Sequence, residues 1–319
     1  MQSLPAPGLP PPPIVRAGGL TMRYGSGVTA LADLDVQVPA GSVGLVGANG
    51  AGKTTLFRLM LGLMEPTAGW LEVTGRVVAH DPVGVRSRLG YMPEHDCLPL
   101  DQTAADAVAT FGEISGLPPR AARQRASDML DLVGLDEARF RPIAGYSTGM
   151  RQRAKLAQAL VADPELVLLD EPTAGLDPVG REEMLRLVGR LSGFGISVLM
   201  ATHLLDDVQR VCEHIVMIEA GRLLLAGPVH QLVQRTGVMR VEVGGHSEAA
   251  RLLAEALVAR GLGVTPVDEG SLDVDTASHG EDAFDTVRDV IGDLGLRLYS
   301  LSTRHQSLDD LFLTRAAQQ

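Results

Sequence analysis

The sequence contains few aromatic residues and almost no cysteine. Aromatic side chains make up 3% of its 319 residues, although hydrophobic residues as a whole reach 45%. A full core is therefore expected, filled by aliphatic side chains and alanine. The two cysteines, Cys97 and Cys212, are far apart in the sequence. They give neither a disulfide framework nor the ligand spacing of a zinc site, which fits a reducing compartment.

Long apolar runs and an excess of basic residues are also missing. No stretch approaches the roughly 18 apolar residues that a membrane-spanning helix needs. The N-terminus has no basic region followed by an apolar core, so we expect no signal peptide. The formal net charge of −11 argues against a dedicated nucleic-acid-binding protein, which needs a basic face. If the protein works at a membrane, we expect it to dock there on another chain.

What the sequence does contain is a phosphate-binding loop. Residues 46–55 read V-G-A-N-G-A-G-K-T-T and match the pattern G-x-x-x-x-G-K-[ST]. An apolar run at 43–46 predicts a strand before the loop, and the spacing of 53–64 predicts a helix after it. Glycines let backbone N–H groups close around an anion, and the helix start adds partial positive charge. These flanking elements disfavour a chance glycine-rich turn.

The loop supplies a set of candidate nucleotide ligands. Lys53 is expected to neutralise β- and γ-phosphate oxygens, and Thr54 to offer its hydroxyl group to Mg²⁺. The candidate nucleotide-binding residues of the loop are Gly47, Asn49, Gly50, Ala51, Gly52, Lys53, Thr54 and Thr55.

A pair of acids follows a short apolar strand. Residues 166–169 have the composition of a buried parallel strand, and Asp170 and Glu171 come directly after it. Open α/β sheets bind ligands at this end of their strands. Asp170 is suited to a metal shell, and Glu171 to orienting or deprotonating a water molecule. Acids at strand ends are also common as helix caps, so the pair alone leaves both interpretations open.

Two more polar residues follow predicted strands. Residues 89–92 form one such strand before Glu94, and 196–200 form another before His203. A lone histidine after a strand is more often a capping or packing residue than a catalytic one. The convergence of several strand ends on one edge favours the functional interpretation.

The rest of the chain predicts further parts. Residues 1–13 are rich in proline and predict a disordered tail. Short apolar stretches within 14–38 predict antiparallel strands, and 98–158 predict a helical insert between strands of the core. In 237–319 the order strand, helix, two strands, helix, strand predicts a small α+β domain of split βαβ type. A short capped helix is expected from Ser307.

Two other places could contact a nucleotide. Tyr24 could be a stacking platform for a base or an ordinary half-buried strand residue. The segment Y-S-T-G-M at 146–150 places Ser147 and Gly149 before a predicted helix. It could be a second anion-binding helix start or a plain N-cap.

Taken together, these motifs closely resemble the ATP-binding subunit of an ABC transporter over residues 15–236, because five motifs occur in the family's order. The resemblance implies an α/β fold: a P-loop ATPase core with a mixed sheet, an antiparallel strand group and a helical subdomain. It also implies that Tyr24 stacks on adenine, that the turn at 174–177 contacts another subunit, and that His203 is the family's switch histidine.

The resemblance further implies a sandwich of two such subunits. Each ATP is then held between the phosphate loop of one subunit and the Ser147–Gly149 segment of the other. The residues expected to act on ATP are Glu171 and His203, and those expected around Mg²⁺ are Thr54, Glu94 and Asp170.

Three positions depart from the family pattern. Glu94 stands where the family usually has Gln, Thr148 replaces a Gly, and Met150 replaces the Gln of the signature segment. These variants and the extra domain at 237–319 resemble the exporter branch with drug- or polysaccharide-type permeases, in which the membrane domains are separate polypeptides. The expected partners are a multi-span permease and a second copy of the subunit, with no nucleic acid. The expected location is the cytoplasmic face of the cell membrane.

Two alternatives stay open. One is an ABC-type ATPase that acts without a permease, in translation or DNA repair. The chain shows one ATPase unit and no sustained heptads, which disfavours it. The other is a nucleotide-gated regulator that does not hydrolyse ATP. The departures from the family pattern keep this reading open, whereas Glu171 and His203 argue for turnover.

Overall fold

The computed structural model describes residues 12–25, 27–232, 235–244, 246–268, 270–275 and 282–305. The chain divides into two compact units, Met1–Val229 and His230–Gln319. This division comes earlier than the expected boundary between residues 236 and 237, because strand β11 (Arg235–Gly244) belongs to the sheet of the second unit. The expected proline-rich tail, except its last two residues, and the helix expected from Ser307 lie outside the described residues.

A six-stranded sheet forms the centre of the first unit. Its order is β10-β9-β3-β8-β7-β6, with all neighbours parallel except β10, which runs antiparallel to β9. The strands β3, β7 and β8 are buried along their whole length, as their apolar sequences predict. Their bounds are β3 (Ser42–Val46), β6 (Leu89–Met92), β7 (Leu166–Asp170), β8 (Ser197–Thr202), β9 (His214–Glu219) and β10 (Arg222–Pro228).

A second sheet of the first unit is antiparallel and has the order β2-β1-β4-β5. Helix α1 (Lys53–Met60) packs its apolar face into the core that the two sheets share, where Phe57 is fully buried. The predicted antiparallel strand group is thus confirmed. Its bounds are β1 (Val15–Arg23), β2 (Thr29–Val38), β4 (Ala68–Val73) and β5 (Arg76–Val77).

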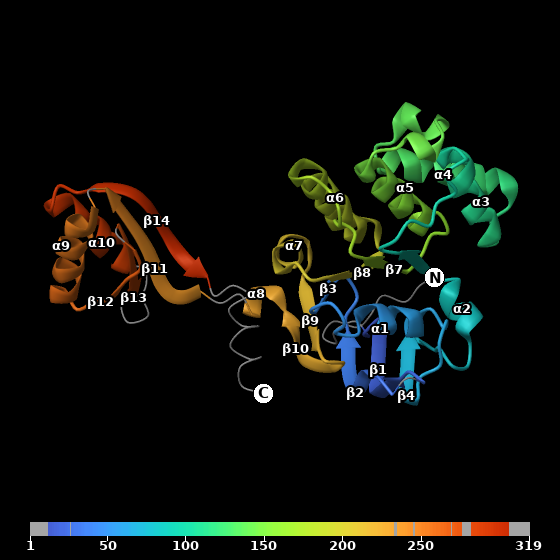
Figure 1. Ribbon diagram of the computed structural model, residues 1–319, viewed down its shortest axis with the longest axis horizontal. Helices are drawn as coiled ribbons and strands as arrows, with labels where there is room; N and C mark the ends of the chain where they lie inside the picture. Colours follow the sequence, from blue (N-terminus) through green and yellow to red (C-terminus); the bar gives the residue numbers. More distant parts are fainter. Residues whose placement is uncertain are drawn as a thin grey trace, which may run out of the picture. The chain divides into compact units, whose positions relative to one another are not determined.

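Three helices of the first unit pack on one another as the predicted helical insert. They are α3 (Ala104–Ile114), α4 (Pro119–Leu132) and α5 (Thr148–Leu160), and Figure 1 shows them grouped together. The other helices are α2 (Pro82–Arg86), α6 (Pro178–Leu191), α7 (Leu205–Val211) and α8 (Val229–Leu232). In the part of the chain that the structure describes, no helix is long and apolar enough to cross a bilayer.

The second unit is an α+β domain with a four-stranded antiparallel sheet in the order β12-β13-β11-β14. The sequence of elements is the predicted strand, helix, two strands, helix, strand. Its apolar core is its own and includes Val241, Leu253 and Val287. The remaining bounds are α9 (His246–Ala259), β12 (Gly263–Pro266), β13 (Ser271–Asp275), α10 (Asp282–Asp293) and β14 (Arg297–His305).

The helix after the phosphate loop is shorter than the expected 53–64. Gly62 adopts φ 62°, a left-handed conformation, and the N–H of Leu63 donates to the carbonyl of Arg58 at 2.9 Å. This pattern closes α1 with a glycine cap. Leu63 is therefore 63% exposed and does not continue the buried face of the helix.

Candidate functional site

The phosphate loop connects β3 to α1, and its glycines are required by its shape. A Cβ atom on Gly47 would come within 2.4 Å of the carbonyl oxygen of Ile218, and one on Gly52 within 2.6 Å of the carbonyl oxygen of Ala30. Gly52 also has φ 110° and Gly50 has φ 84°, where other residues are strained. The loop thus turns tightly under β2 and β9 and delivers the first residue of α1, Lys53, to the site.

Lys53 is buried at the bottom of this loop, with 7% exposure. Its Nζ donates to the carbonyl oxygen of Gly47 at 2.6 Å and lies 3.9 Å from Oε1 of Glu171. Burial lowers the pKa of Lys53, while the nearby carboxylates of Glu171, Asp170 and Glu94 act in the opposite direction. An ammonium group held in this way is available to the oxygens of an anionic ligand.

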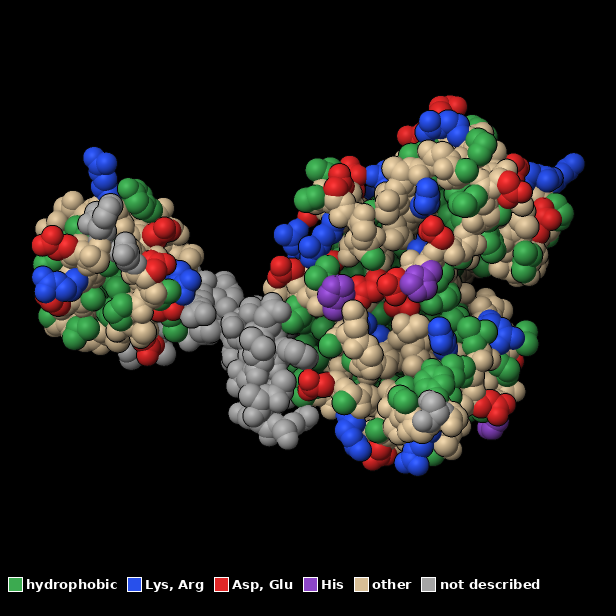
Figure 2. All heavy atoms as spheres, in the orientation of Figure 1, with side chains coloured by type: hydrophobic (Ala, Val, Ile, Leu, Met, Phe, Trp, Pro, Cys, Tyr) green, Lys and Arg blue, Asp and Glu red, His purple; other side chains and the backbone are tan. Residues whose placement is uncertain are grey.

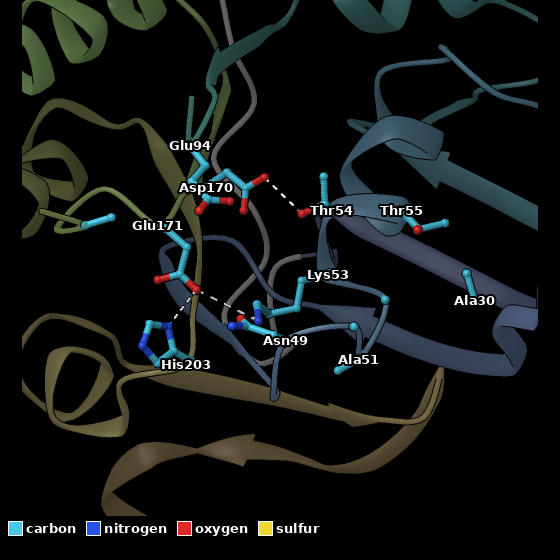
Figure 3. A pocket seen from close by; sticks show the side chains of 13 residues that line it. Ala30, Asn49, Ala51, Lys53, Thr54, Thr55, Glu94, Asp170, Glu171 and His203 are labelled. Atoms are coloured by element: carbon cyan, nitrogen blue, oxygen red, sulfur yellow. Dashed lines mark hydrogen bonds and ion pairs between the residues drawn. The ribbon is translucent and has the colours of Figure 1, made fainter. Parts of the chain in front are cut away.

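Asp170 ends the buried strand β7 and faces the first turn of α1. The hydroxyl of Thr54 donates to Oδ2 of Asp170 at 3.2 Å (Figure 3). Burial raises the pKa of Asp170, and the carboxylates of Glu94 and Glu171 raise it further, whereas the Thr54 hydrogen bond and Lys53 oppose the shift. Two negative neighbours and little water make this carboxylate a good partner for a cation.

Glu171 follows Asp170 with φ 48°, in the left-handed region that a glutamate rarely adopts. The hydroxyl of Thr202 donates to its Oε2 at 3.3 Å, and Nδ1 of His203 lies 3.0 Å from its Oε1. Both partners come from the end of the neighbouring strand β8. The carboxylate is 9% exposed and is fixed between a cation, a hydroxyl and an imidazole. A group in such a position could accept a proton from water.

These side chains surround one cavity of about 370 Å³ (Figure 3). It brings together most of the predicted site, including Glu94 from the end of β6. The lining residues are Ala30, Asn49, Gly50, Ala51, Gly52, Lys53, Thr54, Thr55, Glu94, Asp170, Glu171, Ala174 and His203. Figure 2 shows a cluster of acidic side chains on the surface of the first unit, with a histidine at either end of the cluster.

Four of the predicted residues do not line this cavity. Gly47 lies beneath it and gives its carbonyl oxygen to Lys53. Tyr24 is half-buried against the core, and its hydroxyl forms a hydrogen bond of 3.2 Å with the Thr55 hydroxyl. Ser147 and Gly149 line a second cavity of about 460 Å³, which has no lining residue in common with the first.

The second cavity lies at the start of α5. Ser147 is the N-cap of this helix and accepts the N–H of Met150 at 3.3 Å. The walls of this cavity also include Thr148 and residues from the turn after Ala174, as far as Glu183 on α6. The turn at 174–177 therefore joins the two cavities, since Ala174 lines one and Gly175 the other.

Sequence reasoning missed several residues that support the site. Asp207 on α7 is 1% exposed and accepts hydrogen bonds from Thr173 at 2.8 Å and from Nε of Arg181 at 2.7 Å. Lys155 on α5 is also 1% exposed and donates to the carbonyl oxygen of Glu94 at 2.8 Å. Lys155 interrupts an apolar helix face, and this interruption could have identified it in the sequence. Asp207 lies in an ordinary polar helix, where no sequence pattern marks it.

The fold and the site together define a nucleoside triphosphatase of the P-loop class, with a helical insert and a second cavity at a helix start. The family model described as "ABC transporter" matches residues 31–174. The daunorubicin resistance ATP-binding protein DrrA3 of Streptomyces coeruleorubidus is 34% identical over 300 residues, 94% of each chain. The Nod factor export ATP-binding protein I of Ralstonia nicotianae is 35% identical over 259 residues, 80% of each chain.

Two solved structures share the fold of the first unit. The chain cbiO1 of Clostridium perfringens, part of the ABC transporter complex cbiONQ, has a TM-score of 0.64 and 26% identity, covering 69% of this chain and 90% of that one. The dimeric cassette MJ0796 with ADP and Pi has a TM-score of 0.61 and 23% identity, covering 68% and 99%, and supports the fold alone.

The chain belongs to the ATP-binding proteins of the ABC transporter family, and it binds and hydrolyses ATP. The predicted family, the α/β fold class and the ATPase activity are thereby confirmed.

Proposed function

We propose that this protein supplies the energy for export of a small molecule through a permease encoded as a separate polypeptide. Two relatives that match most of the chain carry drug resistance or factor export in their names. The observation that carries the proposal is the first cavity, in which Lys53, Glu171 and His203 lie in contact.

In this proposal the residues of the cavity divide the work on ATP. Lys53 and the backbone N–H groups of the loop bind the β- and γ-phosphates. Glu171 orients the attacking water and accepts its proton, and His203 holds the carboxylate and the γ-phosphate in position. Phosphoryl transfer depends on positioning and charge neutralisation, which this set of residues provides.

The donor set also suits Mg²⁺. The Thr54 hydroxyl and the carboxylates of Asp170 and Glu94 are hard oxygen ligands, and the cavity has three carboxylates against one lysine. Among the described residues no three His, Cys, Asp or Glu side chains form a metal site by themselves. Magnesium is usually bound through one or two protein oxygens plus substrate phosphates. When bound with ATP, it would neutralise charge on the phosphates.

A second copy of the chain completes the site. Ser147 and Gly149 lie in their own cavity and so do not reach the phosphate loop of the same chain. The helix start there would contribute N–H groups to the γ-phosphate held by a partner subunit. ATP then stabilises the closed pair, and hydrolysis releases it. Tyr24 would lie beside the adenine at the rim.

Closure and reopening would be passed to a multi-span permease at the cytoplasmic face of the cell membrane. The alternative without a permease, in translation or DNA repair, is disfavoured by the net charge of −11, because proteins that bind nucleic acid need a basic face. The alternative of a non-hydrolysing regulator does not agree with the ATPase activity, which the contact between His203 and Glu171 at 3.0 Å also supports.

Two measurements test the proposal. The purified chain is expected to hydrolyse ATP only with Mg²⁺ present, and tagged chain from native membranes is expected to co-purify with a multi-span protein. Mg²⁺-independent hydrolysis would refute the proposed metal shell. Failure of any multi-span protein to co-purify with the tagged chain would instead favour the permease-independent alternative.

A further inference from the structure

Three side chains on one face of α5 contact the segment that leaves β6. Arg151, Lys155 and Gln158 are spaced i, i+4 and i+7, so they lie along one stripe of the helix. Arg151 pairs with Asp96 at 3.6 Å. Lys155 donates to the carbonyl oxygen of Glu94 at 2.8 Å, and the Sγ of Cys97 donates to the Oε1 of Gln158 at 3.9 Å.

Lys155 is the centre of this stripe and the part that water does not reach. A lysine with 1% exposure loses its hydration, and such a loss is tolerated only where other groups compensate. Burial lowers the pKa of Lys155, while Cys97, Asp96, Glu94 and Asp170 oppose that shift. The ammonium group therefore lies within the field of the carboxylates that line the first cavity, although it does not line the cavity itself.

Two parts of α5 thus contact different cavities or their surroundings. Its N-terminus carries Ser147 and Gly149 at the second cavity, and its middle holds the backbone of Glu94 at the first. A helix is a stiff element, so any displacement of its N-terminus is transmitted to the carbonyl group that Lys155 binds.

We propose that Lys155 is a positioning residue for the hydrolysis of ATP: it ties the main chain at Glu94 to helix α5, and so sets the position from which the Glu94 carboxylate reaches the first cavity. The inference rests on the proposed role of Glu94 in the site. The positive charge of Lys155 also offsets the negative charge of the carboxylate at position 94, where the family usually has an amide.

A purely structural lysine and a positioning lysine make different predictions. If Lys155 only stabilised the helical insert, its replacement would lower the rate by the same factor whatever residue stands at 94. If it acts through Glu94, the loss disappears once that side chain is removed. A double-mutant cycle measures this coupling.

The experiment compares Lys155→Met in the wild-type chain and in Glu94→Ala, using kcat and KM for ATP of the full chain with Mg²⁺. We expect Lys155→Met to lower kcat roughly tenfold, with KM changed less than about twofold, because small misplacements of reacting groups reduce the rate steeply. In the Glu94→Ala background we expect a loss of less than about twofold from the same substitution. Equal losses in both backgrounds would overturn the inference.

Three controls keep the outcomes apart. Arg139→Met removes another cation of the helical insert, which donates to Ser127 and pairs with Asp131, and is expected to lower stability but not kcat. Lys155→Gln, which retains an N–H donor, replaces Lys155→Met if the latter does not fold. An unchanged kcat in Glu94→Ala would overturn the premise about that residue, whereas loss of turnover in Glu171→Gln would still support the ATPase site.

Discussion

Two neighbouring acids at the end of β7 have different surroundings. Asp170 accepts a hydrogen bond from Thr54 on the helix that holds the phosphate loop. Glu171 is bonded instead to Thr202 and His203 at the end of β8. Since adjacent residues of a strand point in opposite directions, the left-handed backbone at Glu171 is what brings both carboxylates to one cavity. The strain at this residue thus has a functional consequence.

Glu171→Gln is expected to retain ATP binding and to lose turnover by about two to four orders of magnitude, since general-base catalysis contributes about this much. The amide preserves shape and can still contact Thr202, but it cannot accept a proton from water. Steady-state hydrolysis and equilibrium binding of ATP measure the two effects separately. Turnover at the wild-type rate would refute the assigned role.

Asp170→Asn is expected to stabilise the nucleotide-free protein while abolishing hydrolysis. Burial raises the folded-state pKa of Asp170 above its unfolded value. The contribution of this group to stability is therefore complete below the unfolded pKa and is lost as the pH rises through the folded pKa. At neutral pH the folded chain bears the cost of the ionised group, which the amide removes.

The Tm of Asp170→Asn should exceed that of wild type by roughly 2 to 4 °C at pH 7, the shift expected from about 1 kcal/mol in a domain of this size. The difference should shrink as the pH falls toward the folded pKa of Asp170. A lower Tm at pH 7, or a difference that grows on acidification, would contradict this assignment. Thermal denaturation followed by circular dichroism at several pH values makes the comparison.

At the scale of elements, helices α6 and α7 are joined by two ion pairs, one with a buried carboxylate and one exposed to solvent. Asp207 is buried and binds both Arg181 and Thr173, the residue that opens the turn between the two cavities. Glu182 and Arg210 connect the same two helices, but their side chains are 47% and 60% exposed. The buried pair is expected to fix the turn, and the exposed pair to contribute little.

Asp207→Ala should lower the free energy of unfolding of the first unit by about 2 kcal/mol, because Thr173 loses its acceptor in a buried place. Arg210→Ala is the matched control and should cost less than about 1 kcal/mol. Denaturant unfolding measures both. Similar losses in the two variants would show that burial of Asp207 is not what makes the contact strong.

The elements that the sequence predicted well are those marked by a local pattern of apolar and polar residues. The strands before Lys53 and before Asp170 are short apolar runs with polar ends, and both were found in their expected places. The strands β9 and β10 were missed, although Ile215–Ile218 form an apolar run of the same kind, because no motif marked them. The end of α1 was placed too late, since the left-handed cap at Gly62 outweighs the helical spacing around it.

Side-chain contacts between distant segments could not be predicted in the same way. Tyr24 lies with its hydroxyl on Thr55 and its ring against the core, not in the cavity. The bond between Lys155 and the Glu94 carbonyl joins residues 61 positions apart. Such contacts depend on how the helical insert packs on the sheet, which no local pattern determines. The sequence likewise does not show that the predicted nucleotide-binding residues line two separate cavities.

At the scale of the whole molecule, the two units have separate cores. The core of the first unit runs from Val15 to Ile218, and that of the second from Met239 to Ile291. Deletion of residues 237–319 should therefore leave a folded protein that still binds ATP. If the second unit is a dimerisation or regulatory module, ATP-driven dimerisation of the deletion variant should weaken.

Dimerisation of the deletion variant and of the full chain is measured by analytical ultracentrifugation, with and without ATP. Loss of ATP binding would contradict the independence of the first unit. Unchanged dimerisation would instead identify the second unit as a passive addition to the ATPase.

The central claim is that two chains close over two nucleotides, each held between the first cavity of one chain and the second cavity of the other. Two inactive variants test it. Lys53→Ala destroys the first cavity and leaves the second intact. Gly149→Asp places a negative charge in the second cavity and leaves the first intact, and it should fold, because a Cβ there is 3.8 Å from the nearest atom of Leu176.

The most direct measurement is the ATPase rate of an equimolar mixture of Lys53→Ala and Gly149→Asp. Each alone should be inactive, and the mixture should recover up to about a quarter of the wild-type rate, because half of randomly formed dimers contain one complete site. A mixture no faster than its components, with both variants folded and Gly149→Asp still binding ATP, would contradict the claim.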